Sequence, residues 1–172
     1  LEVTFLTAMG DDDFTHTVAA SCGKLGIDIS HALQVPGGAS STYLFIADPD
    51  GEMALALNDM EIFRHVTPDY LASRLSVLNN AQLVVVDANI PEESIAWLCE
   101  HVTVPIFADP VSTAKAGKFR GSLGRLHTIK PNRLEAELLS GVTIADRASL
   151  ERAADALLDT GLHRVFISLG GD

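Results

Sequence analysis

The sequence predicts an α/β protein with a doubly wound, mostly parallel β-sheet flanked by helices. β-prone runs recur at roughly 20–25-residue spacing, and the segments between them carry apolar residues at helical intervals. A nearly continuous apolar run at 82–86 is typical of a central parallel strand that is covered on both faces. The runs at 41–47 and 52–58 are joined by Asp-Pro-Asp-Gly, which indicates an antiparallel β-hairpin beside the main sheet.

The amino-acid composition limits the classes of molecule that the protein can be expected to bind. The chain has 172 residues, with 12 basic and 23 acidic side chains and a formal net charge of −11. This charge argues against nucleic-acid and anionic-membrane surfaces, although a local phosphate site remains compatible with it. Cys22 and Cys99 lie in apolar helical patterns and are interpreted as buried thiols in a reducing cytosol. With no membrane-span pattern and no signal-peptide pattern, the predicted location is cytoplasmic.

The first segment predicts a strand at 2–9 followed by a helix. Gly10 interrupts the strand, and the aspartates at 11–13 suit the positive end of a helix dipole. We interpret these aspartates as a solvated helix start. The expected inward face of this helix contains Val18, Ala19, Cys22 and Leu25.

The middle of the chain alternates helices and strands. Thr67 and Pro68 have the pattern of an N-cap followed by proline at the first helical position, with Tyr70, Leu71, Leu75 and Leu78 expected inward. Another helix is predicted to start at 91–93, and a strand at 104–108 follows it. Asp87 and Asp109 come directly after the strands at 82–86 and 104–108, at the edge where open α/β sheets bind ligands.

The stretch at 127–141 predicts a strand that runs into a capped helix. Lys130 and Pro131 end the strand, because proline cannot donate to a sheet ladder. Asn132 stands at the N-cap, and Glu135 follows three residues later, as in a capping box. The pattern alone allows a purely structural cap or a ligand site. The predicted inward face contains Leu134, Leu138 and Leu139, and Gly141 ends the helix.

Two further segments complete the pattern. We interpret the segment at 115–125 as a solvated, mobile surface loop, because it carries four basic side chains: Lys115, Lys118, Arg120 and Arg125. A helix is predicted at 146–160, with Leu150, Ala153, Ala154, Leu157 and Leu158 inward, and a strand at 164–169 follows. Glycines at its end suit close approach to a ligand. The sequence has no Gly-x-Gly-x-x-Gly and no Walker motif, which argues against dinucleotide-binding and P-loop proteins.

The run Lys-Pro-Asn-Arg-Leu-Glu-Ala-Glu at 130–137 resembles the Asn-x-x-Glu motif of the PfkB (ribokinase-like) sugar and nucleoside kinases. Phe-Ala-Asp-Pro-Val at 107–111 and the Ser-Leu-Gly-Gly turn at 168–171 resemble further motifs of this family. The resemblance implies a ribokinase-like fold that uses ATP and Mg²⁺, with K⁺ as a further candidate ion. The nucleotide- or phosphate-binding residues that it implies are Lys130, Asn132, Ser168, Gly170 and Gly171, and the metal-binding residues are Glu135 and Asp109.

The same resemblance implies a lid at about 38–60 that closes over the substrate and often mediates dimers. It places Ser41, Thr42, Asn58, Asp59 and Asp87 near the substrate. An edge hairpin of the main sheet is the structural alternative. The sequence departs from the family at Thr15, where a glycine usually follows the phenylalanine.

The run Gly-Glu-Met-Ala-Leu-Ala-Leu-Asn-Asp-Met at 51–60 is most similar to the subfamily that phosphorylates the 5′-hydroxyl of pseudouridine. Ribose, fructose or another nucleoside is the alternative substrate, and a non-catalytic fragment is the alternative class. By family criteria we expect 1–172 to be a partial domain without the amino-terminal Gly-Gly motif and the carboxyl-terminal Gly-Ala-Gly-Asp motif. The general-base aspartate is therefore expected beyond residue 172, and this chain alone is expected to be inactive.

Overall fold

The computed structural model describes residues 1–50 and 53–170, so the predicted turn glycine at 51 and the predicted site residue Gly171 lie outside the described residues. The chain divides into two compact units, Leu1–Val66 and Thr67–Asp172. Each unit is described below by itself.

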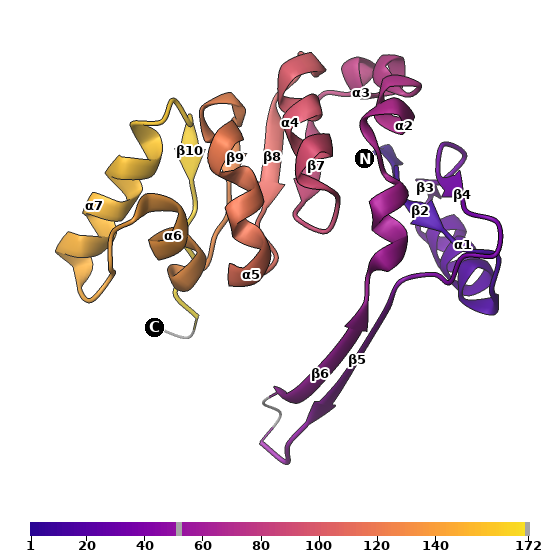
Figure 1. Ribbon diagram of the computed structural model, residues 1–172, viewed down its shortest axis with the longest axis horizontal. Coiled ribbons are helices and arrows are strands. Elements are labelled where there is room, and N and C mark those ends of the chain that lie inside the picture. The colour runs from indigo at the N-terminus through magenta and orange to yellow at the C-terminus, as the bar shows by residue number, and fades with distance from the viewer. Residues whose placement is uncertain (51–52, 171–172) are drawn as a thin grey trace. The chain divides into compact units, whose positions relative to one another are not determined.

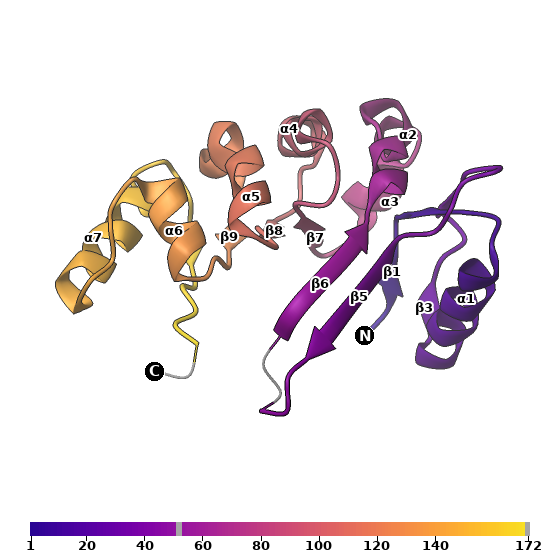
Figure 2. The same cartoon turned by 60° about the horizontal axis from the view of Figure 1, so that its bottom comes forward.

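The second unit is built on a parallel four-stranded sheet (Figure 1). Its strands run in the order β10-β9-β8-β7, so each strand pairs with its neighbour in sequence. Right-handed connections between such neighbours place all the helices on the same face of the sheet, as Figure 2 shows for α4 to α7. The strands are β7 (Val84–Asp87), β8 (Ile106–Asp109), β9 (Thr128–Ile129) and β10 (Arg164–Val165).

Helices fill the connections of this unit, as the apolar periodicity predicts. They are α2 (Pro68–Ala72), α3 (Leu75–Asn80), α4 (Glu92–His101), α5 (Thr113–Ala116), the 3₁₀ helix η2 (Gly117–Arg125), α6 (Arg133–Ser140) and α7 (Arg147–Leu158). Ile95, Phe119, Ile129 and Leu157 are fully buried between these helices and the sheet. None of the helices in the described ranges is long and apolar enough to cross a membrane.

Several predicted features of this unit are confirmed. Thr67 caps α2 by accepting from Tyr70 N, and Pro68 is its first residue. Gly141 ends α6 with a φ of 73°, in the left-handed region that glycine tolerates. Cys99 of α4 is a buried free thiol, as predicted, and Cys22 in the first unit is one too. Ile95 and Leu98 of α4 are also buried.

Other predictions about burial are wrong. Val85 of β7 is 70% exposed while Val86 is buried, because β7 ends this four-stranded sheet and the helices cover one face. Leu134 is 54% exposed, because α6 turns Glu135, Ala136 and Leu139 inward instead. In α7, Leu158 is exposed while Ala153 and Leu157 form the buried face.

The basic segment at 115–125 is not the predicted solvated loop. It forms α5 and η2, which bury Ala116, Phe119 and Leu123. The predicted helix at 67–78 is also divided, because Ser73 and Arg74 separate α2 from α3.

The first unit contains short parallel strand pairs and helix α1 (Asp13–Leu25). The predicted strand at 2–9 is divided into β1 (Val3–Thr4) and β2 (Ala8–Met9), which pair with β3 (Ile27–Asp28) and β4 (Leu33–Gln34). The pairing register shifts by one residue between the two pairs, at the turn in which Ala32 N donates to Ile29 O. On α1, Cys22 is buried but Val18 and Leu25 are exposed, contrary to the predicted apolar face.

The predicted hairpin is confirmed as an antiparallel pair of β5 (Thr42–Ala47) and β6 (Met53–Asp59), followed by the 3₁₀ helix η1 (Glu61–His65). Both faces of the hairpin are exposed. The large apolar side chains that lie at least half exposed on it are Tyr43, Leu44, Phe45, Ile46, Leu55 and Leu57.

Candidate active site at the carboxyl edge of the sheet

The ends of β7, β8 and β9 bring three predicted site residues to one edge of the sheet. Asp87 and Asp109 are directly paired residues of neighbouring parallel strands. Lys130 follows β9, and its backbone N donates to Ala108 O at 3.0 Å. Because parallel strands share a direction, the three side chains start from the same edge, where open α/β sheets bind ligands.

Asp109 is held by its own loop. Its Oδ1 accepts from Val111 N at 2.8 Å, and Val111 has a φ of 67°, which is unfavourable for a β-branched residue. Such strain costs on the order of 1–3 kcal/mol and is characteristic of functional loops. The other carboxylate oxygen, Oδ2, lies 4.0 Å from Lys130 Nζ, and both side chains are about half exposed. An exposed ion pair of this kind contributes at most ~1 kcal/mol to stability. Because the pair is weak and half exposed, Asp109 Oδ2 stays accessible to a cation.

Asn132 and Glu135 form the predicted capping box at the start of α6. Glu135 N donates to Asn132 Oδ1 at 3.0 Å, and Asn132 N donates to Glu135 Oε2 at 2.8 Å. Glu135 is only 3% exposed. The box therefore fixes both side chains at the positive end of the helix dipole, where anions are stabilised.

The segment after β10 lies beside this helix start. Ser168 N donates to Pro131 O at 2.9 Å, and Ser168 forms an isolated parallel bridge with Asn132. Gly170 follows with a φ of 78°. Two predicted phosphate-binding segments that are far apart in sequence are thus neighbours in space.

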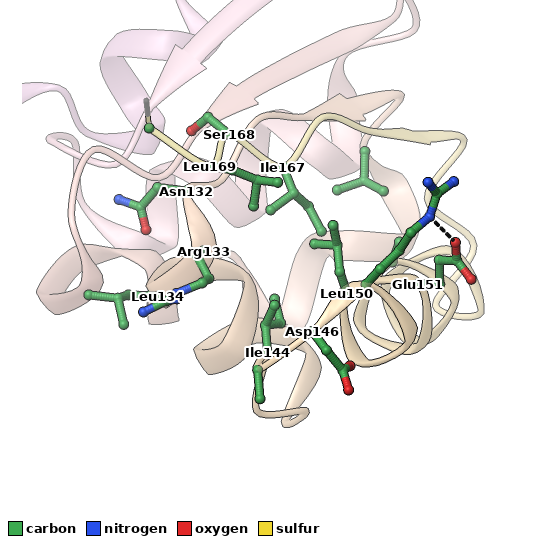
Figure 3. A pocket seen from close by; sticks show the side chains of 15 residues that line it. Asn132, Arg133, Leu134, Ile144, Asp146, Leu150, Glu151, Ile167, Ser168 and Leu169 are labelled. Carbon is green, nitrogen blue, oxygen red and sulfur yellow. Dashed lines mark hydrogen bonds and ion pairs between the residues drawn. The ribbon is translucent and has the colours of Figure 1, made fainter. Parts of the chain in front are cut away.

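A groove of about 1010 Å³ extends from this point along α6, α7 and β10. Figure 3 shows Asn132 and Ser168 at one end of it and Glu151 at the other. Arg147 Nε donates to Glu151 Oε1 at 3.0 Å at that far end. The larger apolar side chains that line the groove are Leu134, Ile144, Leu150, Val165, Ile167 and Leu169.

The chemistry of a magnesium site can be tested on these residues. Within the described ranges, no three His, Cys, Asp or Glu side chains converge as a metal cage. Mg²⁺ bound with phosphate keeps several waters and needs only one or two carboxylates. Asp109, with an accessible Oδ2, fits this requirement better than Glu135, whose Oε2 is already engaged in the capping box.

The four predicted substrate residues of the first unit lie together at the base of the hairpin. Thr42 pairs with Asp59, and Asn58 pairs with Tyr43. Ser41, which precedes β5, is partly buried. Asp59 Oδ1 accepts from Glu61 N at 3.0 Å, which joins the end of β6 to η1.

A hydrogen-bond network at the base of the hairpin was not predicted from the sequence. Asp12 caps α1, and its Oδ2 accepts from Ser40 N at 2.6 Å. Ser40 Oγ accepts from Gly10 N at 3.1 Å and lies 2.8 Å from Thr15 Oγ1. The hydrogen bond from the Ser40 backbone lowers the pKa of the Asp12 carboxyl. Asp12 is therefore an anchor of the hairpin as well as a helix start, a role that no local pattern signals.

Comparison with known proteins agrees with this arrangement. The model of the pfkB family of carbohydrate kinases matches residues 1–172. The chain is 40% identical over 168 residues to pseudouridine kinase from Escherichia coli K12, covering 97% of this chain and 54% of that protein. It is 32% identical over 169 residues to the uncharacterized sugar kinase YeiI of the same organism, covering 98% of this chain and 47% of that protein. The chain thus spans about half the length of the curated relatives it matches.

Among solved structures, an Arabidopsis thaliana ribokinase complexed with ribose and ATP superimposes with a TM-score of 0.84 at 18% identity. The superposition covers 98% of this chain and 55% of the ribokinase. At this identity the likeness concerns the fold, which is ribokinase-like, as the sequence predicts.

Proposed function

Because the chain belongs to the pfkB family of carbohydrate kinases, we propose that it is part of an ATP-dependent kinase that converts pseudouridine to pseudouridine 5′-phosphate. The observation that supports pseudouridine as the substrate is the 40% identity to pseudouridine kinase over 97% of the chain. The identity to a sugar kinase is lower, at 32%, which makes a free sugar the second candidate.

The proposed nucleotide end of the site is the junction of α6 with the segment after β10. The start of α6 offers backbone N–H groups and a positive dipole to phosphate oxygens. Asn132 is fixed there by the capping box, and Ser168 and Gly170 lie beside it. We assign these three residues and Gly171 to phosphate binding, with Lys130 as the nearby positive charge.

Magnesium, when bound, would neutralise charge on the phosphate oxygens during transfer. In our proposal Asp109 holds this ion, directly or through water, with its Oδ2. Glu135 contributes negative charge from its buried position and orients Asn132 through the hydrogen bond at 2.8 Å. K⁺ is a further candidate ion for which these residues form no evident cage.

The hairpin is proposed to act as a lid over the acceptor. Ser41, Thr42, Asn58 and Asp59 at its base supply hydroxyl, amide and carboxylate groups that suit sugar hydroxyls and a base edge. Asp87, in the second unit, is proposed as an acceptor-binding residue on the strength of the family resemblance. The exposed apolar faces of β5 and β6 support a homodimer formed through this hairpin, since faces of this kind are normally covered. The two buried free cysteines support a cytoplasmic location.

The experiment is an ADP-release assay on the protein expressed from its complete reading frame. Pseudouridine, uridine, ribose and fructose are offered side by side with ATP and Mg²⁺. We expect turnover with pseudouridine alone. Turnover confined to ribose or fructose would show a kinase with a different substrate. No ADP release with any of the four compounds would contradict the proposal.

A further inference from the structure

The turn at Asp87–Ile90 is held from outside by two lysines that lie about thirty residues later. Lys118 Nζ donates to Ala88 O and to Ile90 O, each at 2.8 Å. Lys115 Nζ donates to Asn89 Oδ1 at 2.6 Å. Three consecutive residues of one turn are therefore fixed by the ammonium groups of one short helical segment.

Asp87 is tied into the same arrangement. Its Oδ1 accepts from Asn89 N at 2.8 Å, and its Oδ2 accepts from Asn89 Nδ2 at 2.7 Å. Asn89 thus connects the Asp87 carboxylate to Lys115. The orientation of this carboxylate depends on Asn89, and the orientation of Asn89 depends on Lys115.

Burial explains why a lysine is needed at this turn. Ala88 has no exposed surface, and its N–H donates to Asp109 O at 3.1 Å. The Ala88 carbonyl lies beyond the end of β7, and a buried carbonyl needs a hydrogen-bond partner. Lys118 supplies this partner.

The lysine stems are themselves fixed. Ala116 and Phe119 are both fully buried and flank the two lysines on α5 and η2. Residues three apart on a helical segment face the same side, so Lys115 and Lys118 reach the turn together. Partial burial lowers the pKa of Lys118, and the neighbouring Lys115 lowers it further, whereas Asp87, Glu92 and Glu93 raise it.

We propose that Lys118, assisted by Lys115, is a positioning residue that holds the Asp87–Ile90 turn at the carboxyl edge of the sheet and so presents Asp87 to the acceptor. The assignment of Asp87 to the acceptor rests on the proposed function. The hold on the turn itself rests on the hydrogen bonds of Lys115 and Lys118 and is independent of the substrate.

The test compares Lys118→Met, which keeps an unbranched side chain one atom shorter and removes its donors, with Lys118→Arg and with the exposed-surface control Lys24→Met. Each protein is expressed from the complete reading frame. Amide hydrogen exchange is measured at residues 87–90, and KM is measured separately for the acceptor and for ATP. Asn89→Ala, which leaves Lys118 and the buried residues intact, provides a second variant should Lys118→Met fail to fold.

We expect Lys118→Met to accelerate exchange at 87–90 about tenfold relative to the rest of the sheet. We expect the acceptor KM to rise about tenfold or more while the ATP KM stays within about twofold, because a displaced acceptor contact leaves the nucleotide end intact. Lys118→Arg should recover part of both effects, and Lys24→Met should show neither.

Equal exchange at 87–90 in wild type and in both Lys118→Met and Asn89→Ala would overturn the proposed hold. Faster exchange with an unchanged acceptor KM would overturn the positioning role. Failure of the proposed function looks different: the wild type would be silent on all four acceptors, and the exchange comparison would still decide whether Lys118 holds the turn.

Discussion

Asp87 and Asp109 are paired residues at the ends of neighbouring strands, and each accepts a hydrogen bond at 2.8 Å from the backbone N–H two residues later. They differ in their second oxygen. Asp87 Oδ2 accepts from Asn89 Nδ2 at 2.7 Å, whereas Asp109 Oδ2 has Lys130 Nζ at 4.0 Å. The two carboxylates therefore accept equivalent backbone hydrogen bonds but differ in their availability for a cation.

This difference predicts how magnesium dependence responds to substitution. Asp109→Asn should raise the Mg²⁺ concentration needed for half-maximal kinase activity by about tenfold, because an accessible anionic oxygen is lost. Asp87→Asn, the matched control in the paired position, should change it by less than about twofold, since the Asp87 carboxylate is already engaged. Titration of Mg²⁺ at saturating ATP measures both, and an equal shift in the two variants would contradict the assignment of the metal to Asp109.

Loss of the N-cap at α6 should measurably lower the stability of the protein. Asn132→Ala removes the acceptor for Glu135 N and should lower the free energy of unfolding by about 1 kcal/mol. Urea denaturation checks this, with Asn80→Ala at an exposed position of α3 as the control. A change no larger than that of the control would show that the cap contributes little to the fold.

Glu135 allows its structural and chemical roles to be separated. Glu135→Gln keeps an oxygen acceptor for Asn132 N and should alter the free energy of unfolding by less than about 0.5 kcal/mol. Glu135→Ala removes the acceptor and should cost about 1–2 kcal/mol. If the charge serves phosphate transfer, both variants should lose about tenfold or more of the ADP-release rate. Full activity of Glu135→Gln would assign this residue to capping alone.

The close approach of Gly10 to the hairpin base predicts a steric effect. A Cβ at this position would lie on the Gly38 carbonyl oxygen and 2.8 Å from Ser40 N, both of which are backbone atoms. Gly10→Ala should therefore destabilise the protein by about 1–3 kcal/mol. Gly23→Ala is the control, because nothing lies within 4 Å of the added Cβ and α1 should gain about 0.5–1 kcal/mol. Thermal melting of the two variants should shift in opposite directions.

The lowered pKa of Asp12 predicts a pH dependence. A carboxyl whose folded pKa is depressed below the ordinary value of 3.8 adds stability above that value, and the added stability is lost as the pH falls through the folded pKa. The difference in unfolding free energy between wild type and Asp12→Asn should therefore shrink as the pH falls below about 4. Urea denaturation from about pH 6 to pH 2.5 measures it. Asp13→Asn is the neighbouring control, and a difference for Asp12→Asn that is constant with pH would contradict the role of its charge.

The local features of the site could be predicted because their partners are close in sequence. Asn132 and Glu135 are three residues apart, as are Thr67 and Tyr70, so helix geometry alone brings each pair together. The alternation of strands and helices, which follows from apolar periodicity, was likewise sufficient for the fold class and for placing Asp87 and Asp109 at strand ends.

Which face of each helix or strand is buried was harder to predict. Leu134 and Val85 are apolar and lie in the predicted elements, yet both are exposed, because the neighbours of α6 and β7 decide which face is covered. Periodicity identifies a helix or a strand but does not fix its rotation against its neighbours.

Local sequence patterns were sufficient to predict most strands and helices, the caps of α2 and α6, and the family motif. Tertiary structure alone decided that Ser40 binds Asp12 and that Lys118 binds the carbonyls of Ala88 and Ile90, across separations of 28 to 30 residues. The physical reason is that a contact between distant residues depends on strand register and on helix packing, which the whole chain sets together. A hydrogen bond within one helical turn needs neither.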